Sequence, residues 1–308
     1  MRSSRRSGDL GSRVCPKSEG RFTVEVKRCA LLGLCSLTLG VHQQCKHSVA
    51  NAGVLASLLL ILQDVKDIRC LRTATYCIGA LAEAAGVKQN IGMNHDLFKA
   101  MIDQGNQDDV SILRNVAYFL ALMSEGGYEN HPFIVEEGGL RTLVRLMSAD
   151  DVEIQEYSTF AIAHLASNHE YQVRIVQEGA LKPLISMMQV HSQPRHYAGL
   201  AVLKLADNYE THIEIAKEGG VDALIRLARA HSTDEELQYK AALTVGHLAS
   251  NAIQLSSTFK KGSSTLRRSG RPPRKLNDAL SSKTAKISNT AAQNRTKEFL
   301  DQKSKTMK

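Results

Sequence analysis

Apolar positions in the middle of the chain recur at the spacing of amphipathic helices, interrupted by glycines and polar turns. After Gly138, apolar residues at i, i+3 and i+4 predict one helix, and they are Leu140, Leu143, Val144, Leu146 and Met147. The polar residues 148–151 then predict a turn, whose acidic members begin a longer apolar helix over about 153–166. The pattern therefore predicts a chain built from helical hairpins.

Three stretches of the chain repeat one another in phase. Each passes through an E-G-[GA] step, and the glycines of these steps, Gly138, Gly179 and Gly219, stand 41 and 40 residues apart. An asparagine follows each long helix, and we expect it to end the helix in a left-handed turn. These asparagines are Asn168, Asn208 and Asn251. Because a helical hairpin cannot bury its apolar face alone, the units are expected to stack.

Two further copies, which match the repeat sequence less closely, lie upstream. One opens at Gly53, and in the next His95 takes the place of the glycine. Residues 25–37 have the pattern of the last helix of a partial repeat. The sequence therefore predicts three parts: a basic, disordered segment over 1–24, one partial and five full repeats over 25–252, and a basic, disordered tail over 253–308.

The repeated sequence motif resembles the armadillo repeat. Its motif here is I-V-x-E-G-[GA]-[LV]-x-x-L-[IV], then an acidic turn, then A-x-x-x-L-A-x-N, over about three quarters of the chain. The wording is most similar to the β-catenin-like and vacuolar-scaffold branches of that family. The resemblance implies an all-α fold, a right-handed α-solenoid (armadillo superhelix) of three-helix repeats. It also implies that the third helices line a concave groove that binds polypeptides.

The groove positions lack the residues of one known branch of the family. In importin-α relatives, a Trp and an Asn four residues later grip a basic peptide. The corresponding pairs here contain no such combination, and they are Tyr76/Ala80, Ala117/Ala121, Phe160/His164, Leu200/Lys204 and Leu243/His247.

The later repeats place aromatic and basic residues on one stripe instead. The candidate groove residues are Tyr157, Phe160, His164, Tyr197, Lys204, Lys240 and His247. Charge-assisted hydrogen bonds and aromatic contact area would suit an extended acidic or phosphorylated segment. The alternative is that these polar residues are only solvated, or that His164 and His247 pack against neighbouring repeats.

The net charge of +8 divides unevenly along the chain. Residues 1–28 carry +5 and residues 254–308 carry +11, whereas the residues between them carry −8. The basic residues of the tail gather at Lys260, Lys261, Arg267, Arg268, Arg271, Arg274 and Lys275. Three interpretations stay open: a nuclear localisation signal for a transport receptor, a partial AT-hook for nucleic acid with Ser269 in place of its first Arg, or a solubilising tail.

The sequence offers no recognisable catalytic, metal or cofactor motif. Phosphate-binding glycine loops, G-x-S-x-G and H-E-x-x-H are missing, so we expect no enzyme and no cofactor. One set of zinc-type residues has a spacing that fits no zinc finger: Cys35, His42, Cys45 and His47. No apolar run reaches about 18 residues, so no transmembrane segment is expected. The cysteines form no C-x-x-C pair and no secretory signal is seen, which predicts a cytoplasmic or nuclear location.

The repeat array has no polar capping repeat at either end. We therefore expect a fragment or isoform of a longer protein, or self-association through an uncapped end. The predicted function is a non-enzymatic scaffold or adaptor that binds other proteins through the groove. Two alternatives remain: a nuclear-transport or chromatin-associated factor that acts through the tail, and a fragment of a larger armadillo-containing ubiquitin ligase.

Overall fold

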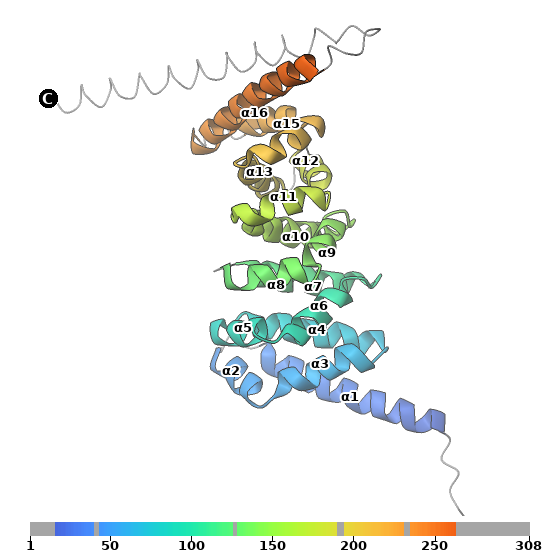
Figure 1. Cartoon of the computed structure of the whole chain (residues 1–308). Coiled ribbons are helices and arrows are strands. Elements are labelled where there is room, and N and C mark those ends of the chain that lie inside the picture. The colour runs from blue at the N-terminus through green and yellow to red at the C-terminus, as the bar shows by residue number, and fades with distance from the viewer. Residues whose placement is uncertain (1–15, 40–42, 126–127, 190–193, 231–234, 263–308) are drawn as a thin grey trace, which may run out of the picture. The chain divides into compact units, whose positions relative to one another are not determined.

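The regular elements of the described chain are all helical. The computed structural model describes residues 16–39, 43–125, 128–189, 194–230 and 235–262, and no strand occurs in these ranges (Figure 1). The α-helices of the first half are α1 (Pro16–Thr38), α2 (Gln43–Asn51), α3 (Val54–Asp64), α4 (Ile68–Ala82), α5 (Ala85–Gly92), α6 (His95–Gln104) and α7 (Val110–Ser124).

The second half continues the same succession. Its α-helices are α8 (His131–Glu136), α9 (Gly139–Leu146), α10 (Val152–Leu165), α11 (His169–Gln177), α12 (Leu181–Gln189), α13 (Pro194–Leu205), α14 (His212–Lys217), α15 (Gly220–Ala230) and α16 (Glu235–Gly262). Short 3₁₀ helices, η1 (Tyr128–Asn130) and η2 (Tyr209–Thr211), precede α8 and α14. The chain divides into two compact units between Val116 and Ala117, within α7, and each unit is described by itself.

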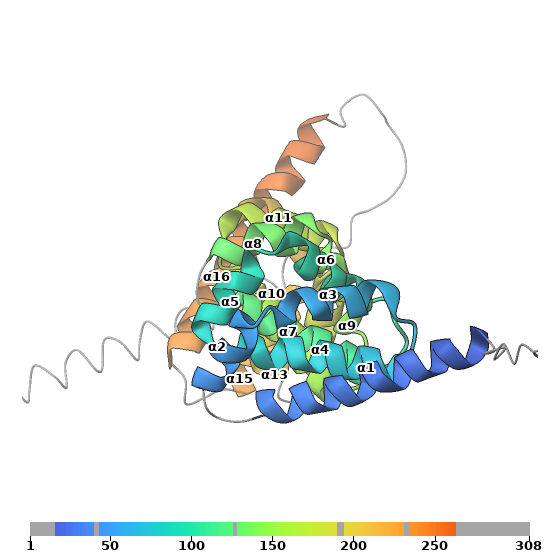
Figure 2. The ribbon, with the colours of Figure 1, turned by 90° about the horizontal axis from the view of Figure 1, so that it is seen from below.

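The first unit contains three-helix repeats packed on a single long helix. Helix α1 lies alongside α4, as a third helix of a partial repeat would (Figure 2). Helices α2, α3 and α4 form one repeat, and α5 and α6 begin the next. Leu58, Ile78 and Phe98 are fully buried between these helices. Helix α1 begins earlier than residue 25, at Pro16, a position where the missing N–H of proline costs nothing.

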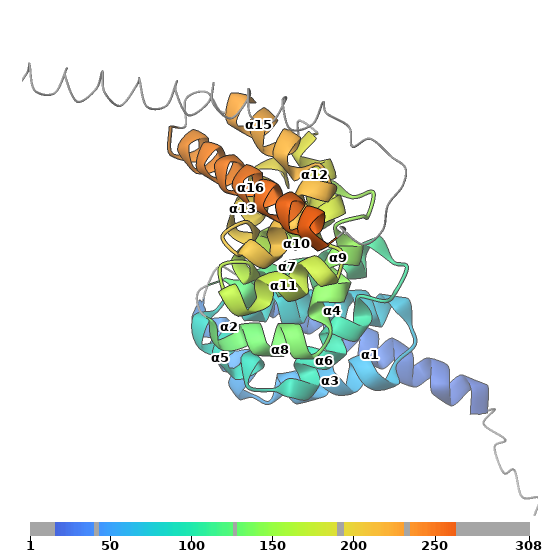
Figure 3. The ribbon, with the colours of Figure 1, turned by 45° about the horizontal axis from the view of Figure 1, so that its top comes forward.

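The second unit repeats the same triplet three times. The third helices α10 and α13 pack against each other, as do the second helices α12 and α15. Helix α16 lies beside α13 and α15 (Figure 3) and continues past residue 252 to Gly262, where no proline interrupts its sequence. An all-α solenoid of three-helix repeats is therefore what the sequence folds into.

The glycine steps hold the backbone that the repeat requires. Gly53, Gly138, Gly179 and Gly219 have φ values of 80°, 82°, 86° and 82°, in the left-handed region that residues with a Cβ avoid. In the remaining repeat, the N-cap of α6 is Asn94, one residue before His95. Asn94 keeps φ at −98° and accepts a hydrogen bond from the backbone N–H of Leu97 at 3.1 Å. The glycine slot assigned to His95 is therefore wrong by one residue.

The asparagines that recur after the long helices have a different role from the predicted one. Asn168 and Asn208 are extended, with φ at −92° and −97°, and their side chains accept hydrogen bonds from the backbone N–H two residues later. They are N-caps of α11 and η2 and do not end the preceding helix in a left-handed turn. Asn251 lies inside α16.

Among the described residues, no single helix is long and apolar enough to cross a bilayer. Helices α2 and α3, which are bent by 71° at their junction, meet that requirement only as a pair.

Candidate functional site on the third helices

Aromatic side chains of successive third helices contact one another in the second unit, and we call this row of rings the ladder. Tyr157, Phe160 and His164 recur at helical spacing along α10, and all are half-buried. The ring of Phe160 lies 4.4 Å from that of His164 and meets the Tyr197 ring of α13 edge-on at 5.1 Å. The structure therefore brings Phe160, His164 and Tyr197 together across two repeats.

The ladder has a member that the sequence interpretation missed. Tyr118 on α7 meets the Tyr157 ring at 5.1 Å in an edge contact. The pair assigned to this repeat, Ala117 and Ala121, is buried in the core at 0% and 4% exposure. The register of α7 is therefore shifted by one residue from the predicted one. The signal was present, because Tyr76, Tyr118 and Phe160 recur every 42 residues.

Lys204 has its ammonium engaged by the neighbouring repeat. Its Nζ donates to the carbonyl of Ala163 at 3.1 Å and to the hydroxyl of Ser167 at 2.5 Å. The side chain thus satisfies an open carbonyl at the C-terminus of α10, where positive charge is favourable. Burial lowers the pKa of Lys204, the Lys240 ammonium lowers it further, and Asp207 acts in the opposite direction. Lys204 is a helix cap as well as a member of the stripe.

The remaining stripe residues lie on α16. Lys240 and His247 are exposed, and Leu243, between them on the same face, is 46% exposed. Helix α16 packs beside α13, and the Lys240 ammonium lowers the pKa of Lys204 on that neighbouring helix. Basic groups at this end of the unit are therefore accessible beside an apolar side chain.

In the second unit, a buried polar residue near the start of each first helix bonds the end of the preceding third helix. These residues stand seven positions before the glycine steps and are His131, Gln172 and His212, which we call the clamp residues. Gln172 donates through Nε2 to the carbonyls of Ala166 at 3.0 Å and Lys204 at 2.9 Å, which joins α10 to α13. The sequence interpretation did not find the clamp residues, although their recurrence ahead of each glycine is a usable signal.

The two histidine clamps bond the end of the preceding third helix through an imidazole. Nε2 of His131 lies 2.9 Å from the carbonyl of Ser124, and Nε2 of His212 lies 2.8 Å from that of Ala206. The amide of Asn251 lies 2.7 Å from Nδ1 of His212 and donates to it, so Nε2 carries the proton. Burial lowers the pKa of His131, and its hydrogen bond to the Ser124 carbonyl only partly offsets this.

The candidate basic tail falls largely outside the described residues. Arg267, Arg268, Arg271, Arg274 and Lys275 lie beyond them, and Lys260 and Lys261 lie in the part of α16 whose side chains are not described. Within the described part of the chain, no group of three or more His, Cys, Asp or Glu side chains has metal-binding geometry.

Comparison with known sequences identifies the repeat. The family model for the Armadillo/beta-catenin-like repeat matches residues 129–167. U-box domain-containing protein 1 of Medicago truncatula is 24% identical over 179 residues, which are 58% of this chain and 24% of that protein. The chain thus spans about a quarter of that relative's length.

Solved structures with the same fold include designed armadillo proteins. One, in complex with the peptide (KR)4, matches 76% of this chain and 95% of its own at a TM-score of 0.60 and 22% identity. Another, designed for modular peptide recognition, matches 71% of this chain and 92% of its own at a TM-score of 0.63 and 23% identity. At these identities the likeness establishes the fold, an armadillo-like solenoid.

Proposed function

Since the chain is an armadillo-repeat protein, we propose that it is a non-enzymatic scaffold that binds extended segments of other proteins across the third helices of its second unit. The face runs from Tyr118 on α7 over α10 and α13 to His247 on α16. The repeats supply a rigid row of helices, which suits the recognition of an extended chain residue by residue.

The observation that carries this proposal is the aromatic ladder. Phe160 contacts both His164 and Tyr197, so the rings are held in place by one another across α10 and α13. Each ring also keeps part of its surface in solvent. Preorganised, half-exposed aromatic side chains supply contact area at little cost in conformational entropy, as binding hot spots do.

The charge next to the ladder favours an acidic or phosphorylated ligand. Lys240 and His247 are exposed on α16, beside Lys204, whose ammonium donates to Ala163 and Ser167. Charge-assisted hydrogen bonds from Lys240 and His247 would orient a carboxylate or a phosphate beside the ladder. One designed armadillo protein of the same fold binds the basic peptide (KR)4, so a basic peptide is the ligand with which an acidic one should be compared.

The test compares three labelled peptides by fluorescence anisotropy: an acidic peptide, its phosphorylated form and (KR)4. We expect the phosphorylated form to bind best, and Phe160→Ala with Lys240→Glu to weaken it by a factor of about 10 or more. The control, Arg141→Glu with Arg226→Glu, reverses two exposed charges on second helices and should leave the affinity unchanged. Stronger binding of (KR)4 would reverse the assigned ligand charge, and equal binding by all variants would refute the face itself.

A second candidate function rests on the Medicago truncatula relative, a U-box protein. Here the armadillo repeats would be the substrate-docking arm of a ubiquitin ligase. A ubiquitin-transfer assay with purified activating and conjugating enzymes separates the two. The scaffold proposal expects no ubiquitin chains from this protein alone, and chain formation that requires it would favour the ligase.

A further inference from the structure

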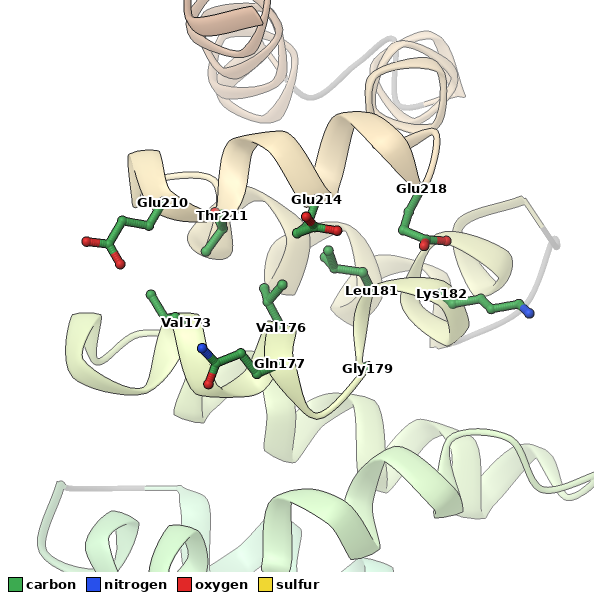
Figure 4. Close-up of a pocket in the computed structure, with 10 residues that line it drawn as sticks. All are labelled: Val173, Val176, Gln177, Gly179, Leu181, Lys182, Glu210, Thr211, Glu214 and Glu218. Carbon is green, nitrogen blue, oxygen red and sulfur yellow. The ribbon is translucent and has the colours of Figure 1, made fainter. Parts of the chain in front are cut away.

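A cavity of about 600 Å³ lies on the first helices of the second unit, and none of its lining residues belongs to the third-helix stripe (Figure 4). The floor of the cavity comes from α11 and the start of α12, and the wall that faces this floor comes from η2 and α14. Val173, Val176 and Leu181 form its apolar floor, and Thr211 is buried beside them. The cavity is therefore lined with surface against which a methylene chain can pack.

Three carboxylates stand in a row above this floor. Glu210, Glu214 and Glu218 follow at intervals of four residues, so they share one face of η2 and α14 at a spacing of about 6 Å (Figure 4). Lys182 is the one cation among the lining residues. Glu214 forms an ion pair with Lys217, and both side chains of this pair are exposed to solvent. The wall is thus acidic, and its internal ion pair is of the kind that is exchanged at little cost.

An acidic wall over an apolar floor matches a lysine or arginine side chain. The aliphatic stem of such a side chain packs on apolar surface while its charged end stays at the rim. The charged end would then donate charge-assisted hydrogen bonds to the carboxylates. The occupant predicted by this chemistry is a peptide segment rich in Lys and Arg.

The chain itself carries such a segment directly after α16. Residues 263–275 directly follow α16 and contain five basic residues: Arg267, Arg268, Arg271, Arg274 and Lys275. Helix α16 packs on α14, and Asn251 is hydrogen-bonded to His212, the first residue of α14. Gly262 is eleven helical residues farther on, about 16 Å along the axis. Nine extended residues, from Gly262 to Arg271, cover up to about 30 Å, enough to return to the cavity.

We propose that the basic segment 263–275 of this chain docks in the acidic cavity between α11 and α14. The docked state neutralises the carboxylate row and withholds the basic segment from outside partners, while the third-helix face stays open. This inference does not depend on the proposed function, since none of the cavity residues belongs to the ladder. A short tether gives an effective concentration of about 1 mM, so weak individual contacts are enough to populate the docked state.

The experiment uses the full chain and a triple variant, Glu210→Gln, Glu214→Gln and Glu218→Gln. A matched control neutralises three exposed acids outside the cavity: Glu129→Gln, Asp150→Asn and Glu170→Gln. Trypsin cleavage after Arg267 and Arg268 is followed at low and high salt. Zero-length carbodiimide cross-links from Lys260, Lys261 and Lys275 are mapped by mass spectrometry in a mixture of isotopically light and heavy protein.

We expect the cavity variant to be cleaved about five times faster than wild type at low salt, since cleavage follows the population of the undocked state. The control variant should match wild type, and high salt should remove the difference. Cross-links to Glu210, Glu214 or Glu218 should join residues of one isotopic copy. Links only between light and heavy copies would assign the cavity to a second molecule and overturn the proposal. Equal cleavage of all variants, without links to the cavity, would also overturn it.

Discussion

The two units tie neighbouring third helices together with different chemistry. In the first unit, Arg72 of α4 forms a bidentate ion pair with Asp109, just before α7, at distances of 2.5–3.0 Å. A second ion pair joins Lys46 of α2 to Glu83 at the end of α4. In the second unit, the Gln172 amide joins α10 to α13, and the His212 imidazole joins the end of α13 to Asn251 of α16.

The same repeat position also changes character between the units. Asn115 on α7 donates to the carbonyl of Arg72 and to the hydroxyl of Thr75, so its amide is used to join α4 and α7. Forty-two residues later, Tyr157 occupies that position and contributes a ring to the ladder. In the first unit this position thus joins two helices, whereas in the second unit it contributes an aromatic ring to the proposed binding face.

Removing an amide clamp should have the largest effect on stability. Gln172→Ala removes the side-chain donor from the carbonyls of Ala166 and Lys204, of which Lys204 keeps the backbone N–H of Asp207, and we expect a loss of about 2–3 kcal/mol in the free energy of unfolding. Urea unfolding followed by circular dichroism measures it. The loss should be equal at low and high salt because the clamp is neutral. Gln177→Ala, at an exposed position of the same helix, is the control, and an equal loss there would contradict the clamp.

A side chain at a glycine step should cost somewhat less. The position of Cβ at Gly138 meets open space, so Gly138→Ala suffers only from its φ of 82°, at about 1–2 kcal/mol. Gly246→Ala, at a helical glycine that is equally open, should instead stabilise by about 0.5–1 kcal/mol. Thermal or urea unfolding distinguishes the two signs. Destabilisation of both variants would mean that packing rather than backbone conformation limits these positions.

The exceptional repeat should respond to a different change. Asn94→Ala removes the N-cap of α6, which predicts a loss of about 1 kcal/mol. Asn94→Gly should lose only a few tenths of a kcal/mol, because glycine is tolerated as an N-cap. Equal unfolding midpoints for wild type and both variants would show that the Asn94 side chain contributes no cap.

The histidine clamp of the second unit predicts a pH dependence near neutral pH. The pKa of His131 is lower in the folded protein than its usual 6.5, so the unfolded chain binds protons more readily. Stability should therefore fall as the pH drops from about 6.5 towards the folded pKa. His131→Gln, which places the residue of the neighbouring clamp here, should reduce this slope. His169→Gln, at an exposed position, should keep the slope, and its loss there would contradict the assignment.

The ion pair of the first unit should give the smallest effect. Hydrogen bonding from Arg72 lowers the pKa of Asp109, so its contribution is complete above the usual 3.8 and disappears as the pH falls through the lower folded value. Asp109→Asn keeps a residue suited to capping α7 but removes the charge. Its deficit in urea midpoint should shrink at high salt and vanish in acid. A deficit that salt and pH leave unchanged would show that the charge pair contributes nothing.

Local patterns predicted the parts of the fold that depend on neighbouring residues. The apolar spacing predicted the helices, and the glycines predicted the breaks at residues 53, 138, 179 and 219. The errors arose where one residue type serves two local structures. Asparagine suits both a left-handed helix end and an N-cap, so Asn168 and Asn208 were assigned to the wrong end of the turn. In α7, the predicted register was wrong by one residue, so the buried Ala117 was assigned to the groove in place of Tyr118.

The sequence by itself determined that this protein is an α-solenoid, because its repeats and helices arise from contacts within about forty residues. Only the tertiary structure decided which polar side chains are still available to a partner. Lys204 and His164 lie on the same predicted stripe, yet one caps the helix of the preceding repeat and the other stacks in the ladder. The reason is physical: a side chain's hydrogen-bond partner is set by packing between repeats, and that partner is not adjacent in the sequence.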